Sequence, residues 1–149
     1  LLKDSDGAYG FQHSRFRWTR IMTQDQLKNY LQPISGIKKF PKSVNVLKRG
    51  RSGRVLELSI NFGDTQNSII LRRDQIRRIL RNLPSTLFVV KELSKGKWQF
   101  SGGGFGHGAG LSQAGAIDLA RRGWRVEKIL SHYYPGTTFD FLPLNWKSP

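Results

Sequence analysis

The sequence contains no cysteine, which excludes disulfide bonds and metal sites built on thiolates. It also lacks any apolar run near the roughly 18 residues that a membrane-spanning helix requires. Leu1 and Leu2 are followed at once by Lys3, Asp4 and Asp6, so no signal peptide opens the sequence. We therefore expect any export or anchor segment to lie outside these residues. The absence of cysteine says little about the compartment.

Acidic residues are scarce. Ten Asp and Glu stand against 25 Lys and Arg, which gives a formal net charge of +15. Residues 1–100 hold 20 of the basic and 7 of the acidic residues, whereas residues 101–149 hold 5 and 3. Such an excess attracts polyanions, and the candidates are nucleic acid, anionic lipid, teichoic acid and carboxylate-bearing glycan strands. It fits equally well a solvated surface that keeps the protein in solution.

The length of 149 residues favours one ordinary domain with a single core, preceded by a lead-in over residues 1–14. A hydrophobic content of 38% indicates a globular rather than a disordered chain. Alternating apolar residues predict strands near 16–21, 44–46, 56–60, 68–71, 87–90 and 97–100, with turns at 49–53 and 62–64.

Helices are predicted from their caps and their apolar spacing. The first begins at Thr23, which forms a capping box with Gln26, and is ended by Pro33 and Gly36. Others are expected from Asp74, over 112–122 and over 126–133. The pattern predicts an α+β fold, with one antiparallel sheet or open barrel, short helices, and a site at a glycine-rich loop between a strand and a helix.

That loop is the most unusual part of the sequence. Glycine occupies most positions from Gly102 to Gly110, and a single ionisable side chain, His107, lies between two glycines. Glycine is costly to order, so such a run indicates either positive φ angles or close approach of another molecule to the backbone. Histidine is a residue type that titrates near neutral pH. The spacing matches neither a G-x-G-x-x-G dinucleotide fingerprint nor a phosphate-binding loop, which needs a lysine.

The string Gly-x-Gly-Phe-Gly-His-Gly-x-Gly-Leu-Ser-Gln-x-Gly-Ala at 102–116, followed by His-Tyr-Tyr-Pro-Gly-Thr at 132–137, resembles the SpoIID/LytB family of bacterial cell-wall proteins. Weaker similarities at 17–27, 52–55 and 76–80 extend the resemblance over roughly residues 15 to 141. The resemblance implies a SpoIID-like lytic transglycosylase that acts on glycan strands without stem peptides, or an amidase enhancer. It implies an extracytoplasmic location in the cell envelope, and for some relatives a role in sporulation.

The resemblance also suggests site residues. We expect His107 to be the catalytic candidate, although a structural histidine bonded to nearby backbone is the alternative. The residues expected to line the substrate groove are Gly104, Gly106, Gly108, Gly110, Ser112, Gln113, His132, Tyr133 and Arg77. Tyrosines that leave a helix before Pro-Gly often fill a core, which is the alternative for Tyr133.

Cleavage of a glycosidic bond needs a protonated carboxylic acid, and none of the ten acidic residues stands out in an apolar setting. The family's catalytic glutamate belongs to an N-terminal segment that these residues do not contain. The chain is therefore expected to be a portion of the family domain that forms the groove, or a non-catalytic module that binds peptidoglycan or stimulates an amidase.

Partners and cofactors follow from the same reasoning. Peptidoglycan glycan strands are the expected partner, with a cell-wall amidase as a further one. No cofactor and no metal are expected, because three histidines without a metal-binding spacing make a zinc site improbable. Nucleic acid is the weakest alternative, since Arg17-Trp18 is the nearest case of an interleaved aromatic residue and most arginines lie on a predicted helix without aromatic residues.

Overall fold

The computed structural model describes residues 8–63, 68–81, 83–138 and 140. These residues form two compact units. One, the sheet unit, comprises Ser14–Gly108. The other, the helical unit, joins residues 8–13 to residues 109–138 and 140. The unit boundary falls inside the glycine-rich loop, between Gly108 and Ala109.

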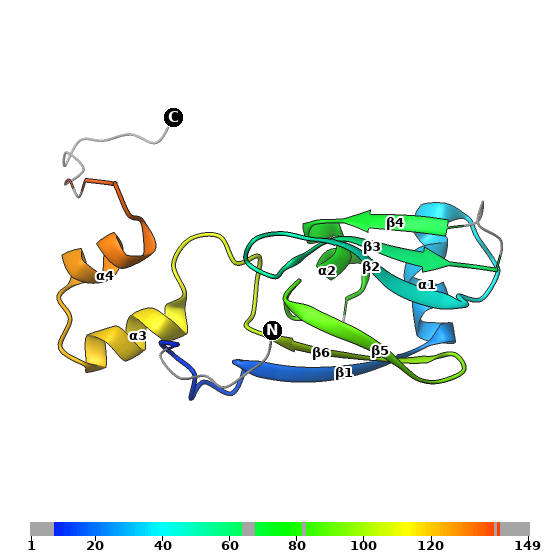
Figure 1. The fold of residues 1–149 in the computed structure, drawn as a ribbon, viewed down its shortest axis with the longest axis horizontal. Coiled ribbons are helices and arrows are strands. Elements are labelled where there is room, and N and C mark those ends of the chain that lie inside the picture. The colour runs from blue at the N-terminus through cyan, green and yellow to red at the C-terminus, as the bar shows by residue number, and fades with distance from the viewer. Residues whose placement is uncertain (1–7, 64–67, 82, 139, 141–149) are drawn as a thin grey trace. The chain divides into compact units, whose positions relative to one another are not determined.

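Two antiparallel sheets build the sheet unit (Figure 1). The first has the strand order β1 (Arg17–Thr23), β6 (Lys97–Gly103) and β5 (Phe88–Ser94). The second has the order β2 (Ser43–Arg49), β3 (Val55–Asn61) and β4 (Ser68–Arg72). The hairpin predicted around residues 49–53 is confirmed, since it joins β2 to β3. The other predicted turn extends to Asp64, which lies outside the described residues.

Both sheets contribute to one hydrophobic core. Trp98 and Phe100 of β6 are 1% and 0% exposed, and Leu58 and Ile60 of β3 are fully buried. Aromatic side chains of this size dominate core energetics because each removes a large apolar area from water. The central strand β6 is therefore firmly anchored where it leads into the glycine loop.

Gly102 lies at the end of this central strand for a packing reason. Its register partners are Trp18 on β1 and Phe88 on β5, both buried aromatics. The indole ring of Trp18 fills the space that a side chain at Gly102 would need. A glycine inside a strand commonly marks such a close approach.

Two helices accompany the sheets. In α1 (Gln24–Ser35), Thr23 and Gln26 form the predicted capping box, which is confirmed. Pro33 does not end this helix as expected but lies inside it, because a proline removes only one backbone hydrogen bond near the last turn. The helix ends at Gly36, which takes the left-handed conformation. The shorter α2 (Asp74–Ile79) begins at the predicted aspartate.

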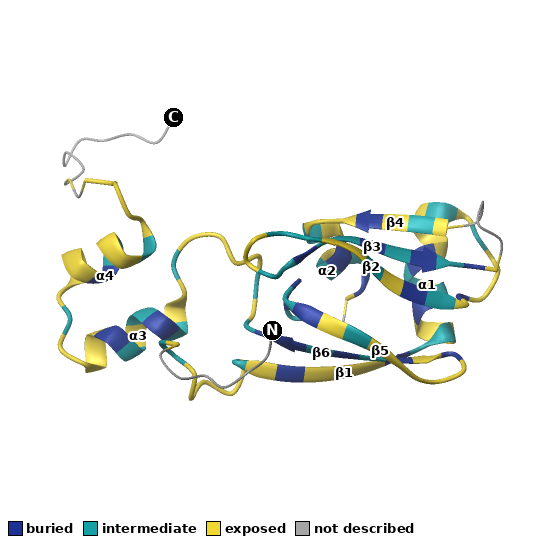
Figure 2. Ribbon diagram, in the orientation of Figure 1, coloured by how far each residue is buried: buried dark blue, intermediate teal, exposed yellow. Residues whose placement is uncertain are grey.

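The helical unit contains α3 (Gln113–Arg121) and α4 (Val126–Tyr133), both close to their predicted bounds. Ser112 caps α3 as expected, since its hydroxyl accepts a hydrogen bond from the amide of Gly115 at 3.2 Å. Figure 2 shows that most of α4 is exposed, whereas α3 carries buried, half-buried and exposed residues. The buried apolar side chains here are Leu119 and Ile129, so this unit has a small core of its own.

The predicted fold class is confirmed: the described residues form an α+β structure with two antiparallel three-stranded sheets and short helices. The open sheets are not closed into a barrel.

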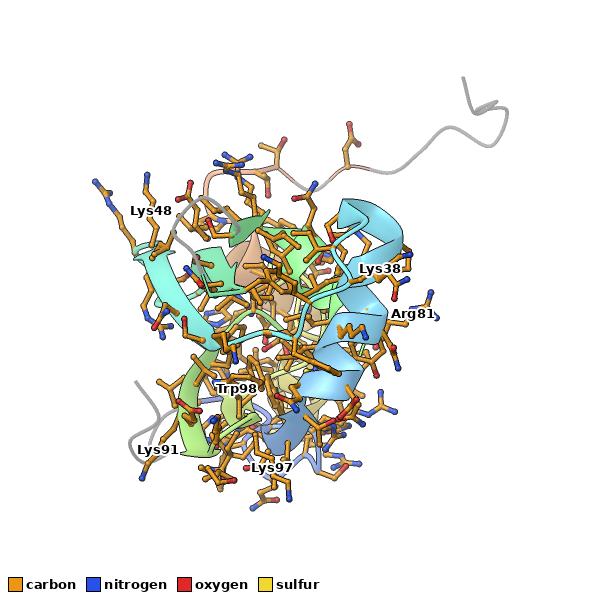
Figure 3. The ribbon with its side chains drawn as sticks, turned by 90° about the vertical axis from the view of Figure 1, so that its right-hand side faces the viewer. Lys38, Lys48, Arg81, Lys91, Lys97 and Trp98 are labelled. Atoms are coloured by element: carbon orange, nitrogen blue, oxygen red, sulfur yellow. The ribbon has the colours of Figure 1, made fainter. Side chains whose placement is uncertain are left out.

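The basic residues of the sheet unit are dispersed. Figure 3 shows Lys48, Lys91, Lys97 and Arg81 pointing outward from different elements, while Trp98 lies at the centre. These four cationic side chains therefore lie on different parts of the surface of the sheet unit. In the described part of the chain, no helix is both long and apolar enough to cross a membrane.

Candidate functional site

The residues predicted to line the site belong to both units. The sheet unit carries Gly104, Gly106, His107, Gly108 and Arg77, and the helical unit carries Gly110, Ser112, Gln113, His132 and Tyr133. Each group has its own local geometry.

In the sheet unit, the backbone of the glycine loop is held by hydrogen bonds as it leaves β6. The amides of Gly104 and Gly106 donate to the carbonyl oxygens of Phe16 and Pro84, at 3.0 and 2.9 Å. The indole Nε1 of Trp18 donates to the carbonyl oxygen of Gly104 at 2.9 Å. Because these two amides already donate to carbonyl oxygens, they do not serve as hydrogen-bond donors to a ligand, which can contact only the backbone surface here.

The loop alternates in backbone conformation. Gly104, Gly106, Gly108 and Gly110 have φ values of 72°, 94°, 75° and 83°, whereas the residues between them do not have positive φ. A side chain built at Gly104 or Gly106 would meet no atom of the described residues within 4 Å. Glycine is therefore required at these two positions by φ, and its lack of a side chain leaves the surface open there.

Gly108 is different, because another side chain lies where its own side chain would be. The guanidinium group of Arg54, from the turn that precedes β3, fills the space that a side chain at this position would need. Its Nη1 atom is buried and has no hydrogen-bond partner in the described residues. This desolvation lowers the pKa of Arg54 from its ordinary value. No local sequence pattern indicated that Arg54 reaches the loop.

His107 lies on the loop with an exposed side chain. A hydrogen bond from Arg77 is the main reason that the pKa of the carboxyl group of Asp74, at the start of α2, is lowered. The charges of Arg77, Arg78 and His107 also contribute to this lowered pKa. Arg77 donates to Asp74 Oδ1 at 3.0 Å, and Arg78 approaches Oδ2 at 3.0 Å. The predicted substrate residue Arg77 is thus part of an ion-pair cluster that includes Asp74.

In the helical unit, the two sequence motifs interlock. The hydroxyl of Tyr133 fills the space that a side chain at Gly115 would need, and it hydrogen-bonds the side chain of Ser112. Burial raises the pKa of Tyr133, although the bond to Ser112 opposes this. Tyr134 accepts a hydrogen bond at its hydroxyl from the amide of Leu111, at 3.1 Å. The tyrosines at the end of α4 therefore hold the second half of the glycine motif in place.

His132 belongs to an aromatic cluster. Its ring meets the rings of Tyr9, Trp124 and Tyr133 edge to face, with centroids 5.4, 6.0 and 4.9 Å apart. Such pairs contribute stability beyond the area they bury. The imidazole of His132 nevertheless remains exposed at the surface of the unit.

The lead-in also contributes to this unit. The amide of Gly10 donates to Asp118 Oδ2 on α3 at 2.9 Å, and the guanidinium carbon of Arg122 lies 5.4 Å from the ring centre of Tyr9. The hydrogen bond from Arg122, followed by that from Gly10, lowers the pKa of the Asp118 carboxyl. Sequence patterns missed this packing because residues 8–13 have no periodicity to indicate a buried face.

Among the residues that the structure describes, no three His, Asp or Glu side chains converge in a way that could hold a metal ion.

Comparison with known proteins gives a family. A family model described as a domain of unknown function (DUF8618) matches residues 1–110. The match ends two residues beyond Gly108, where the sheet unit ends.

Curated relatives match over shorter segments. The chain is 48% identical over 54 residues to a protein named Amidase enhancer from Bacillus subtilis (strain 168), which covers 36% of this chain and 8% of the relative. It is 53% identical over 34 residues to Stage II sporulation protein D of the same organism, and this match covers 23% of this chain and 10% of that protein. An uncharacterized protein of Brachyspira hyodysenteriae is 29% identical over 119 residues, and this match covers 80% of this chain and 31% of that protein.

The matched segments therefore span less than a third of the length of each of these relatives. The names Amidase enhancer and Stage II sporulation protein D confirm the predicted relationship to the SpoIID/LytB proteins.

Proposed function

Because the chain belongs to the DUF8618 family and is related to the SpoIID/LytB proteins, we propose that it binds glycan strands for a protein that remodels bacterial peptidoglycan. The strand lies along Gly104–Gly108, and His107 contacts it. In this proposal the protein works outside the cytoplasm, in the cell envelope.

One observation carries the proposal. His107 is exposed on a loop whose neighbouring glycines, Gly104 and Gly106, have open space where side chains would be. A polymer can therefore approach the backbone closely at the two glycines that precede the imidazole. Hydrogen bonds hold the loop on both sides of Phe105, so little conformational freedom is lost when a strand binds.

The electrostatics around His107 favour binding over cleavage by these residues. Breaking a glycosidic bond needs a carboxylic acid that is still protonated near neutral pH. The carboxyl group that responds to His107 is Asp74, whose pKa is lowered, so it is ionised there. We therefore assign lytic transglycosylase chemistry, which the family resemblance implies, to the whole protein and not to these residues alone.

A second candidate is a non-catalytic module that stimulates an amidase. The similarity to a protein named Amidase enhancer favours it. In that case the chain binds the wall and an amidase together, and no glycosidic bond is broken by either unit.

The test measures binding and cleavage separately. Purified sacculi, and glycan strands stripped of peptides, are incubated with the chain, and bound protein and released fragments are quantified. Binding without cleavage is expected, and His107→Gln should weaken it more than the control His13→Gln. The second candidate is tested by measuring the rate of a cell-wall amidase with and without the chain, and it predicts a higher rate with the chain. Cleavage by this chain alone would refute the assignment of the acid to another segment, and absence of binding to either material would overturn the proposal.

A further inference from the structure

A cleft beside the glycine loop has no role in the function proposed so far. It lies within the sheet unit and has a volume of about 330 Å³. Its lining combines Arg15, Arg17 and Arg20, from the start of β1 and the residues before it, with Phe105 of the loop. A volume of this size is at the lower end of small-ligand sites and suits one sugar residue better than a large surface contact.

The cleft is strongly basic. Its three arginine side chains come from a segment of six residues, and all three residues are exposed. None of the residues that line it is acidic. Guanidinium groups present planar pairs of donors that match a carboxylate, and they stay charged at any physiological pH. The cleft is therefore suited to an anionic group.

Phe105 gives the cleft an apolar wall. Its side chain is 61% exposed, more than any other large hydrophobic side chain in the described residues. The guanidinium carbon of Arg15 lies 4.6 Å from the ring centre, in the range of a cation–π contact. Gly104 and Gly106, on either side of this residue, donate backbone hydrogen bonds to Phe16 and Pro84. The backbone that carries the ring is thus fixed before any ligand binds, which lowers the entropic cost of binding.

We propose that this cleft binds a carboxylate-bearing sugar residue, with Arg15, Arg17 and Arg20 holding the carboxylate and Phe105 packing against the apolar face of the ring. The inference rests on the proposed function, because the sugar belongs to the same glycan strand. The Cα atoms of Phe105 and His107 can lie no more than about 7 Å apart, so the cleft and His107 lie on the same short segment of the loop.

Nucleic acid is a different class of ligand, and the cleft is less suited to it. Proteins that bind single strands combine a basic groove with several aromatic side chains on which successive bases stack. Here one exposed ring, Phe105, accompanies the three arginines, while Trp18 in the lining is only 8% exposed.

The experiment measures the affinity of the full chain for peptide-stripped glycan strands at constant ionic strength. Three variants are compared with wild type: a cleft triple (Arg15→Gln, Arg17→Gln, Arg20→Gln), Phe105→Ala, and a control triple (Lys48→Gln, Lys91→Gln, Lys97→Gln). The control removes the same charge from exposed lysines on β2, β5 and β6. Each protein is also tested with strands whose carboxylates have been converted to neutral amides.

The cleft triple should bind native strands at least about tenfold more weakly, because charge-assisted hydrogen bonds are lost. Wild type should bind the neutralised strands about tenfold more weakly than native strands. The cleft triple should bind native and neutralised strands with the same affinity. Phe105→Ala should weaken binding about fivefold on both materials, and the control triple less than about threefold. Phe105 is exposed, so its variant tests the cleft even where the triple does not fold.

Equal losses for the two triples would overturn the inference while leaving the proposed function intact. Failure of wild type to bind any strand would instead overturn the proposed function. If wild type binds short single-stranded DNA as tightly as it binds glycan strands, and the cleft triple no longer binds this DNA, the cleft is a general polyanion site. The assignment to a sugar carboxylate is then wrong.

Discussion

The guanidinium group of Arg54 occupies the space that a side chain at Gly108 would need. The two residues are distant in sequence, and their contact ties the turn between β2 and β3 to the glycine loop beside His107. Because Arg54 Nη1 is buried without a hydrogen-bond partner in the described residues, the side chain is held there despite a desolvation cost. We infer that Arg54 fixes the position of the loop.

Replacing Gly108 with alanine tests this contact. Gly104 is the matched control, because its φ of 72° is close to the 75° of Gly108 but its surroundings are open. Gly104→Ala should cost roughly 1–2 kcal/mol of unfolding free energy from the left-handed backbone alone. Gly108→Ala should cost about 1–3 kcal/mol more, because Arg54 must move.

Urea denaturation of the two variants, repeated in an Arg54→Ala background, measures the coupling. In that background the difference between the two glycine positions should shrink to within about 0.5 kcal/mol. If the difference survives, the extra cost does not come from Arg54.

Tyr133 should stabilise the helical unit through its hydroxyl group. Tyr133→Phe removes the hydrogen bond with Ser112 and should cost about 0.5–1.5 kcal/mol. Tyr134→Phe is the control, since its hydroxyl is on a more exposed residue and water can replace it as the acceptor for the Leu111 amide. Amide hydrogen exchange in α3 and α4 reports the change, and a larger effect for Tyr134 would contradict the assignment.

Asp74 should make the sheet unit sensitive to acid. Its folded-state pKa lies below the ordinary aspartate value, so the stability it contributes is complete above about pH 4 and is lost as the pH falls through the lowered pKa. Asp74→Asn should flatten this loss. Arg77→Gln should raise the pKa of Asp74 more than Arg78→Gln does, because the hydrogen bond from Arg77 is the main cause of the shift. Carboxyl carbon NMR titration measures the pKa, and equal shifts in the two arginine variants would contradict this order.

Arg73 is a position where glycine should improve stability. Among the described residues that are not glycine, it alone has positive φ, at 49°, just before α2. Arg73→Gly should raise the unfolding free energy by about 1 kcal/mol, since its backbone hydrogen bond to Leu56 does not depend on the side chain. The same change at Arg78, inside α2, should lower it by a similar amount. Thermal denaturation distinguishes the two, and destabilisation by Arg73→Gly would show that the backbone there is not strained.

Local patterns in the sequence were sufficient for most of the secondary structure. The capping box at Thr23, the Ser112 cap and the glycines of the β2–β3 turn each satisfy backbone groups within a few residues, so neighbouring residues alone determine them. Pro33 was misjudged because it lies near the last turn of α1, where a proline removes only one backbone hydrogen bond and the helix continues to Ser35.

The candidate site was predicted less completely. Composition and a family resemblance singled out His107, its flanking glycines and Arg77, but not Arg15 and Arg54. Counting charges indicated that the glycine segment is not basic, whereas Arg15 and Arg54 reach it from other parts of the chain. The contacts of Gly10 with Asp118 and of Tyr9 with Arg122 were missed because each joins residues far apart in the sequence.

The sequence by itself therefore determined which segments are strands and helices, where the glycine loop lies, and which family the motifs resemble. Those features depend on short-range periodicity, caps and turn residues, which are readable along the chain. Only the tertiary structure decided that Trp18 fills the space beside Gly102, that Arg54 lies where a side chain at Gly108 would be, and that Phe105 faces a basic cleft. These contacts join residues far apart in sequence, and side-chain packing in three dimensions, which no local pattern encodes, selects them.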